Sequence, residues 1–212
     1  MEFNLVGKNL SFRYNQGKAL SYPDLDIERG SHWLVLGASG SGKTTLLNMI
    51  SGLLKPLGGE VKFGDIDLYS MSPSKIDRFR GEHLGIVFQT PRFLSGLSVK
   101  ENLLCANYFA GKKEDPKRMY YLLESLGMKG SEKGKIKDFS QGELQRLSIA
   151  RALMNNPEIL IADEPSSSLD DQNCQEMINL LESEADEFNS TLLIVSHDAR
   201  IRSRFKNQIF LE

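Results

Sequence analysis

A stretch of eight residues has the composition and spacing of a loop that binds phosphate groups. It reads Gly37-Ala38-Ser39-Gly40-Ser41-Gly42-Lys43-Thr44 and fits the pattern G-x-x-x-x-G-K-[ST]. Glycine permits positive φ angles and has no Cβ, so successive backbone N–H groups can close around phosphate oxygens. Lys43 can reach the β- and γ-phosphates of a nucleotide, and the hydroxyl of Thr44 can ligate Mg²⁺. The sequence therefore predicts a nucleotide site, with a glycine-rich turn that binds nothing as the alternative.

Two adjacent acids give the second chemical signal. Asp163 and Glu164 follow the apolar residues 159–162, and the carboxyl end of a strand is where an α/β sheet presents ligands. Asp163 is expected to hold Mg²⁺ through water, and Glu164 to orient or deprotonate an attacking water. Two capping or surface acids are the structural alternative.

A third segment, 138–146, begins a predicted helix. Ser140-x-x-Glu143 has the spacing of a capping box, which is a purely structural helix start. A serine together with Gly142 at an exposed helix N-terminus also makes an anion site. Both interpretations remain open, because one does not exclude the other.

The elements that must position these motifs alternate between strands and helices. Strands are expected at 4–14, 22–27, 33–36, 60–63, 84–88, 158–162 and 191–195. Helices are expected from 44 to about 50, over 98–124 with breaks near Gly111 and Pro116, and over 140–154, 171–187 and 198–205. Continuous apolar strands between helices are typical of a buried parallel sheet. The sequence thus predicts an α/β fold with a mainly parallel sheet and a helical subdomain at about 91–138, whose end, 129–138, is expected to be a loop.

Composition narrows the class of protein. The 212 residues are 40% hydrophobic and 25% charged, and the formal net charge is −2. This is an ordinary globular balance, and it argues against a generally basic nucleic-acid binder. No apolar run approaches the ~20 residues that span a bilayer, and the first residues lack the pattern of a signal peptide. Cys105 and Cys174 lie far apart, so we expect a reducing cytoplasm and neither a disulfide nor a zinc cluster.

In their order along the chain, these motifs resemble those of the ATP-binding subunit of an ABC transporter. That family carries a signature L-S-G-G-Q shortly before its Asp-Glu strand, and here the signature segment reads Phe139-Ser140-Gln141-Gly142-Glu143. The serine and the second glycine match, whereas Gln141 replaces the first glycine and Glu143 replaces glutamine. Gln141 places a side chain where the family's backbone approaches a phosphate. The resemblance covers the chain roughly from Leu5 to Phe210.

The resemblance implies roles for four further positions. Gln89 matches the Q-loop, which touches Mg²⁺ and senses the membrane partner. Ser168-Leu169-Asp170 matches the D-loop, which crosses to the other subunit. His197 matches the switch histidine near the γ-phosphate, and Tyr14 matches the aromatic residue that stacks on adenine. Each residue taken alone also fits a surface, capping or packing role.

The resemblance also implies a complete site in a known type of assembly. The catalytic residues would be Glu164, His197 and Gln89. The nucleotide would contact Tyr14, Gly37, Ala38, Ser39, Gly40, Ser41, Gly42, Lys43, Thr44, Thr45, Ser140, Gly142, Glu143 and Asp170. The residues at the metal would be Thr44, Gln89 and Asp163. ATP and Mg²⁺ are the implied cofactors, and a homodimer or a pair of ATPase subunits would enclose two ATP molecules.

The fold implied by the resemblance is a P-loop NTPase core with an N-terminal antiparallel β part, in one ATPase domain over 1–212. The helical subdomain would lead into a signature helix at 140–154. Integral membrane permease subunits are the implied partners, which puts the chain at the cytoplasmic face of the inner or cell membrane, and no nucleic acid is expected. The segment Leu160 to Pro165 resembles the lipoprotein-releasing and macrolide-exporting group.

Other functions remain open at this point. A soluble ABC-type ATPase that acts on nucleic acid or ribosomes would carry long coiled coils or two such domains, and neither is visible. A P-loop kinase or GTPase would make the signature a coincidence, and no N-K-x-D guanine element is present. A nucleotide-gated scaffold of the cell-division type fits the unusual signature segment.

An apolar cluster follows Gln89. Pro91, Phe93, Leu94 and Leu97 lie in a predicted loop, where exposed apolar side chains are unfavourable without a partner. We therefore expect the surface that couples to the membrane subunits between Thr90 and Asn102. The alternative is that these side chains pack the helical subdomain on the core.

Overall fold

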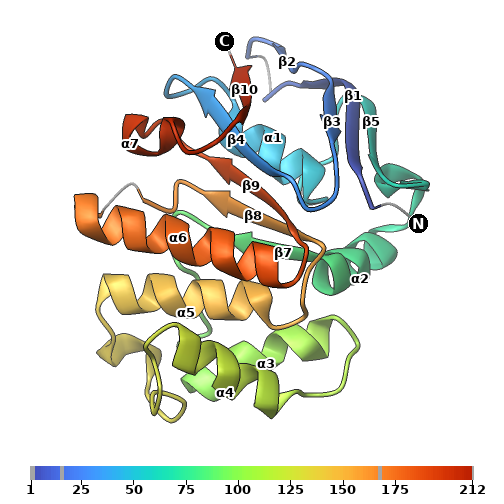
Figure 1. The fold of residues 1–212 in the computed structure, drawn as a ribbon. Helices are drawn as coiled ribbons and strands as arrows, with labels where there is room; N and C mark the ends of the chain where they lie inside the picture. The colour runs from blue at the N-terminus through green and yellow to red at the C-terminus, as the bar shows by residue number, and fades with distance from the viewer. Residues whose placement is uncertain (1–2, 15–16, 167–168, 212) are drawn as a thin grey trace.

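The structure, a computed structural model, describes residues 3–14, 17–166 and 169–211. Its helices are α1 Lys43–Ile50, α2 Pro73–His83, α3 Val99–Phe109, α4 Pro116–Ser125, α5 Gln141–Leu153, α6 Asp171–Glu187 and α7 Ala199–Arg202. Its strands are β1 Leu5–Phe12, β2 Leu20–Ser21, β3 Leu25–Ile27, β4 His32–Gly37, β5 Gly58–Phe63, β6 Ile66–Asp67, β7 Leu84–Val87, β8 Ile159–Asp163, β9 Thr191–Val195 and β10 Asn207–Leu211. Figure 1 shows these elements as two sheets with helices between and below them.

One of the two sheets is parallel and has the strand order β10-β4-β9-β8-β7. All four of its pairings are parallel. Strands of this kind need crossover connections, which here contain helices such as α1, α5 and α6. Because β4, β8 and β9 run in the same direction, the segments that follow them begin at the same edge of the sheet. The predicted α/β fold with a mainly parallel sheet is confirmed.

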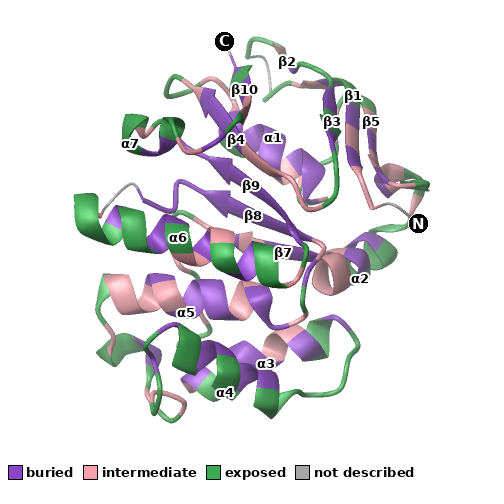
Figure 2. Cartoon of the chain, viewed as in Figure 1, coloured by how far each residue is buried: buried purple, intermediate pink, exposed green. Residues whose placement is uncertain are grey.

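Side chains of the parallel sheet alternate between two hydrophobic cores. Val35 and Ile161 face the core that contains α1, whereas Leu34 and Leu160 face the core that contains α5 and α6. This alternation follows from the two-residue period of a strand. Both faces of the sheet are therefore covered, and Figure 2 shows β8 and β9 as buried over their length.

An antiparallel sheet covers the other side of α1 (Figure 1). Its central strand β1 pairs with β2, β3 and β5, and β5 also pairs with β6. Leu5, Val61 and Phe63 pack in the same core as Leu46 and Ile50 of α1. The N-terminal antiparallel part implied by the resemblance is confirmed, and it fixes the helix that begins at the glycine-rich loop.

Several predicted boundaries differ from the structure. The strand expected at 22–27 is shorter, because only β3 at Leu25–Ile27 falls in that range and β2 lies before it. The helix expected at 198–205 is the single turn of α7. The loop predicted at 129–138 ends in a 3₁₀ turn, Ile136–Asp138, in which Ile136 is buried. Helix α2 and strands β6 and β10 were not predicted from the sequence. The sequence 15–18, Asn-Gln-Gly-Lys, is typical of a turn, and its first two residues lie outside the described residues.

A bulge in β1 places a strict requirement on Gly59. The register between β1 and β5 shifts between Lys8 and Ser11, and Asn9 has a φ of 51°. Opposite this irregularity Gly59 has a φ of 93°, and a Cβ there would lie 2.4 Å from the backbone oxygen of Lys8. Both the backbone angle and the contact exclude a larger residue.

We predict that Gly59→Ala lowers the free energy of unfolding by at least about 2 kcal/mol, because left-handed strain and a backbone clash add. The matched control is Gly127→Ala, where φ is 67° but nothing lies within 4 Å of the added Cβ. In this control the free energy of unfolding should fall by only about 1 kcal/mol, from the left-handed strain alone. Urea denaturation measures both, and equal losses would contradict the proposed clash.

Candidate functional site

A cavity of about 850 Å³ opens at the edge of the sheet where β4, β7, β8 and β9 end. Residues from five predicted segments line it. They are Tyr14, Ala38, Ser39, Gly40, Gly42, Lys43, Thr44, Thr45, Gln89, Glu164 and His197, together with Gly17, Lys18 and Leu20. The last three were not expected from the sequence. The structure thus gathers most of the predicted site residues at one place.

The glycine-rich loop, residues 37–44, joins β4 to α1 and carries its lysine inward. The Nζ of Lys43 donates hydrogen bonds to the backbone oxygens of Gly37, at 2.8 Å, and Ala38, at 2.9 Å. Gly42 caps α1 with a φ of 90°, and its oxygen accepts a bond from the hydroxyl of Tyr22 at 3.2 Å. The N-terminus of α1 therefore meets the cavity with an ammonium group beside it. This combination attracts anions through unpaired backbone N–H groups and the helix dipole.

Asp163 and Thr44 form the second part of the site. The Oγ1 of Thr44 donates to Oδ2 of Asp163 at 3.1 Å. Asp163 is only 7% exposed, and its Oδ1 has no hydrogen-bond partner among the described residues. Burial raises the pKa of Asp163, with a further rise from the charge of Glu164, while Thr44 and Lys43 act in the opposite direction. A buried carboxylate oxygen without a donor is a position where a cation would be favourable.

The donor set at Asp163 fits Mg²⁺. In the described part of the chain, no cluster of three or more His, Cys, Asp or Glu residues could hold a metal by itself. Mg²⁺ is commonly bound through one or two protein oxygens plus water and substrate phosphates. One carboxylate and one hydroxyl beside an anion site match that requirement.

Glu164 and His197 form a hydrogen-bonded pair across the ends of β8 and β9. The Nδ1 of His197 lies 2.7 Å from Oε1 of Glu164. The other oxygen, Oε2, accepts bonds from the hydroxyl of Ser196 at 3.1 Å and from the backbone N–H of His197 at 3.4 Å. Glu164 has a φ of 48°, and its N–H donates to the oxygen of Val195 at 2.8 Å. The carboxylate is thus 8% exposed and fixed from three sides.

Ser196 was missed in the sequence. Its side chain is fully buried and orients the Glu164 carboxylate. The available signal was its position between the apolar strand and His197, where a small polar residue is unusual for a buried site.

Tyr14 and Gln89 lie at the rim of the cavity. The ring of Tyr14 is 54% exposed and contacts Phe12 edge-on, with ring centroids 4.7 Å apart. Its hydroxyl is 3.1 Å from Oγ1 of Thr45. Gln89 is exposed and follows β7 by two residues. An exposed ring at the mouth of a phosphate site is suitable for stacking on a base.

The signature segment does not reach this cavity. Ser140 caps α5 in a full capping box, in which its N–H and hydroxyl both bond Oε2 of Glu143, at 2.8 and 2.7 Å. The capping interpretation is therefore confirmed, and these bonds lower the pKa of Glu143. Gly142 lines a different hollow of about 480 Å³ that also includes Leu169.

Asp170 is also outside the cavity and caps α6. Its Oδ1 accepts the N–H of Asn173 at 2.8 Å, and the bonds from Asn173 lower the pKa of Asp170. Ser168 lies outside the described residues. Within one copy, the described residues of the signature segment and Asp170 are therefore not part of the P-loop site.

Comparison with known proteins decides the family. The family model described as ABC transporter matches residues 20–167. The chain belongs to the ABC transporter family. The cassette is 40% identical over 188 residues to the lipoprotein-releasing system ATP-binding protein LolD of Leptospira interrogans, which covers 88% of this chain and 79% of that protein. It is 38% identical over 181 residues to the macrolide export ATP-binding/permease protein MacB of Rhodopirellula baltica, covering 84% of this chain but 26% of MacB.

Solved structures agree with this assignment. The dimeric structure of the bacterial ABC transporter cassette MJ0796 superposes with a TM-score of 0.87 at 28% identity, over 98% of this chain and 94% of that chain. A dimeric post-hydrolysis state of MJ0796 with ADP and Pi gives the same values. The predictions of an ABC ATP-binding cassette, of ATPase activity and of ATP as ligand are confirmed. In the described ranges, no helix is long and apolar enough to cross a membrane.

We predict that Asp163→Asn stabilises the nucleotide-free cassette at neutral pH. The folded pKa of Asp163 is raised, so its contribution to stability is present at low pH and is lost as pH rises through that pKa. Asparagine carries no charge to bury and still accepts from Thr44. The variant's melting temperature should therefore exceed that of the parent by about 2–4 °C per kcal/mol gained.

The same variant should gain less stability than the parent from added Mg²⁺ and ATP. The control is Asp65→Asn, at an exposed acid outside the cavity. It should change neither the melting temperature without nucleotide nor the stability gained from Mg²⁺ and ATP. A nucleotide-free Asp163→Asn cassette that melts below the parent would contradict the cost assigned to the buried carboxylate.

Proposed function

We propose that two copies of this cassette enclose two ATP molecules and that their hydrolysis drives an integral membrane permease. The observation that carries the proposal is the division of the site. Lys43, Thr44 and Glu164 line one cavity, and Asp163 is hydrogen-bonded to Thr44, while Gly142 in the first turn of α5 lines another hollow of the same chain. A second copy can bring its α5 N-terminus over that cavity, which adds N–H donors for the γ-phosphate and excludes water.

In this proposal the chain's own groups divide the chemistry among them. The loop backbone, Ser39, Ser41 and Lys43 bind the phosphates, and the ring of Tyr14 stacks on adenine. Thr44, Gln89 and Asp163 would hold Mg²⁺, which neutralises charge on the β- and γ-phosphates when it is bound. The signature donors Ser140 and Gly142, together with Glu143 and Asp170, act from the partner copy.

Glu164 is proposed to orient the attacking water and to accept its proton. Its carboxylate already receives three hydrogen bonds, from Ser196 and from the backbone and ring of His197. These bonds fix its direction at the cavity wall. His197 is 65% exposed at its side chain and can turn toward the γ-phosphate while remaining beside Glu164.

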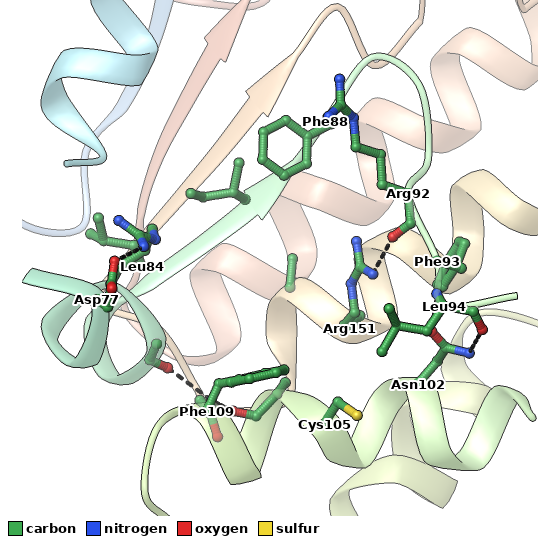
Figure 3. A pocket seen from close by; sticks show the side chains of 16 residues that line it. Asp77, Leu84, Phe88, Arg92, Phe93, Leu94, Asn102, Cys105, Phe109 and Arg151 are labelled. Atoms are coloured by element: carbon green, nitrogen blue, oxygen red, sulfur yellow. Dashed lines mark hydrogen bonds and ion pairs between the residues drawn. The ribbon is translucent and has the colours of Figure 1, made fainter. Parts of the chain in front are cut away.

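The proposed permease contact is a groove next to the predicted coupling segment (Figure 3). Its volume is about 640 Å³, and we call it the docking groove. It lies between α2, the loop after β7, α3 and the end of α5, and is lined by Asp77, Arg80, Gly81, Leu84, Ile86, Phe88, Arg92, Phe93, Leu94, Asn102, Cys105, Ala106, Phe109, Arg151, Ala152 and Asn155. Leu94 and Phe109 are 53% and 67% exposed, which supports a surface that a partner covers.

Hydrogen bonds from Asn102 of α3 fix the conformation of the loop at the docking groove. The buried amide of Asn102 accepts from the N–H of Leu94 at 2.8 Å and donates to the oxygens of Leu94, Leu97 and Ser98. Phe93 packs on the core, and the guanidinium carbon of Arg151 lies over the Phe93 ring, 4.7 Å from the ring centroid. Phe93 therefore follows the packing alternative, whereas Leu94 remains available to a partner.

We further propose that residues 1–212 act as one ATPase domain, with 91–138 as its helical subdomain, at the cytoplasmic face of the membrane. The similarity to the lipoprotein-releasing protein LolD and the macrolide export protein MacB supports a system that extracts or exports its substrate, which the permease would select.

The test of the catalytic assignment is Glu164→Gln. The amide is nearly isosteric but cannot accept the water's proton, so kcat should fall by at least about 100-fold while ATP still binds. Size-exclusion chromatography with Mg²⁺ and ATP should then show a stable dimer. Glu114→Gln, at an exposed acid outside the cavity, is the control and should behave as the parent. Hydrolysis at the parental rate by Glu164→Gln would assign the water to another residue.

The docking groove is tested with Leu94→Glu and Phe109→Glu. Both side chains are exposed, so the variants should fold and bind ATP, but they should lose recovery of the permease when the tagged cassette is purified from membranes of its own host. Tyr120→Glu, at an exposed aromatic residue outside the groove, should retain that recovery. Full permease recovery with both groove variants would reject this surface.

A further inference from the structure

One arginine connects the start of α6 to the turn after β9, which carries His197. Arg200 lies on α7, three residues after His197, and its guanidinium reaches the residues around the start of α6. Its Nη1 donates to the backbone oxygen of Leu169 at 3.1 Å and to Oδ1 of Asp171 at 2.7 Å, and its Nη2 donates to the oxygen of Ser166 at 3.4 Å. We call Ser166, Leu169 and Asp171 the α6 entry.

The same guanidinium also holds Asp198. Nε of Arg200 donates to Oδ1 at 2.9 Å, and Nη2 donates to Oδ2 at 2.7 Å. Oδ2 accepts a further bond from the hydroxyl of Ser166 at 3.0 Å. This paired geometry needs the planar fork of arginine, because a lysine ammonium cannot satisfy a carboxylate and two carbonyl oxygens in these directions.

Asp198 leads directly to the catalytic pair. Its backbone N–H donates to Oγ of Ser196 at 3.0 Å, and that hydroxyl donates to Oε2 of Glu164 at 3.1 Å. The route from the α6 entry to Glu164 is thus continuous, through Arg200, Asp198 and Ser196. Coupled hydrogen bonds of this kind can position a group more strictly than any one bond does.

We propose that Arg200 is a positioning residue for hydrolysis: it ties the α6 entry to the turn that orients Glu164 and His197. The inference rests on the proposed role of Glu164. Displacement of the α6 entry would then move Asp198 and Ser196 and change the direction of the Glu164 carboxylate. ATP binding would be unaffected, because none of these residues lines the P-loop cavity apart from the catalytic pair itself.

A purely structural role is a weaker explanation of these contacts. The side chains of Arg200 and Asp171 are 33% and 90% exposed, and ion pairs at such positions contribute little to the stability of a fold. The arginine also lowers the pKa of Asp198, mainly through their hydrogen bonds, so the carboxylate remains charged and paired under working conditions. The pair with Asp198, whose side chain is 10% exposed, also stabilises the folded turn, so the positioning role is tested by activity measured apart from stability.

The experiment compares Arg200→Gln, Arg200→Lys and Arg202→Gln in steady-state ATPase assays with thermal denaturation alongside. Arg200→Gln should lower kcat about tenfold or more, as small misplacements of a reacting group do, with KM for ATP within about twofold of the parent. Arg200→Lys should recover part of kcat through one bond to Asp198. Arg202 is exposed on the same helix and contacts Phe210 rather than the α6 entry, so Arg202→Gln should match the parent.

The outcomes separate the possible failures. An unchanged kcat for Arg200→Gln, or equal changes in kcat and KM, overturns the positioning role. If Arg200→Gln lowers the melting temperature, and its kcat equals that of the parent when both are assayed well below that temperature, the loss of activity follows from unfolding. The role of Arg200 is then structural, and the inference is wrong. Glu164→Gln is assayed in parallel: if it hydrolyses ATP normally, the proposed function fails, whereas a normal Arg200→Gln beside an inactive Glu164→Gln rejects only the inference.

Discussion

Parallel pairing of β4, β9 and β8 is the constraint on which the site depends. Thr44 and Asp163 are 119 positions apart in sequence, yet they share a hydrogen bond because β4, which leads to the loop before Thr44, and β8, which contains Asp163, end at one edge of the same sheet. Asp163 lies in register with Val195, which places the segment after β9 beside Glu164. A shift of one residue in β8 would turn the Asp163 side chain to the opposite face of the sheet. Two buried cores, one on each face, prevent that shift.

The same edge concentrates ionisable groups that are almost out of contact with water. Lys43, Asp163 and Glu164 are each less than 9% exposed. Backbone oxygens satisfy the lysine, and Ser196 and His197 satisfy Glu164. Among the described residues, Asp163 has a hydrogen-bond partner, Thr44, on one oxygen alone. Burying a charge with an incomplete set of partners is unfavourable. Nucleotide and metal binding would therefore stabilise the fold as well as complete the site, since a ligand that binds only the native state shifts the folding equilibrium.

Much of this arrangement was predictable because its signals are local. The strand, glycine loop and helix at 33–50 follow from apolar runs and turn residues, and the Ser140-x-x-Glu143 box follows from spacing alone. The elements that were not predicted from the sequence, such as α2 and β10, have weak local signals. In α2, only Ile76 and Phe79 are buried, and β10 begins with two polar residues and buries only Ile209 and Leu211. Both are stabilised by tertiary contacts, with the α1 core and with β4, that no short window of sequence records.

In the site, too, the residues in local motifs were predictable from the sequence, whereas those that act through long-range contacts were not. Motif spacing indicated Lys43, Thr44 and the acids, but Ser196 and Arg200 act through bonds to residues more than 25 positions away. Nor could spacing show that the signature segment and the P-loop cavity lie apart in one copy. That separation depends on how α5 packs between α3, α4 and α6, which only the three-dimensional fold defines.

Helix α5 joins the signature segment to the docking groove. Its first turn carries Gly142 and Glu143, and Arg151 and Ala152 near its other end line the docking groove. Thirteen residues of α-helix form a rod about 20 Å long at 1.5 Å per residue. A rod of this length does not bend appreciably under small loads, so a rotation imposed at the groove swings the opposite end through an arc. In the proposed assembly the helix would act as a lever, and the direction in which a permease pushes would determine whether the far end approaches or leaves the nucleotide of the neighbouring copy.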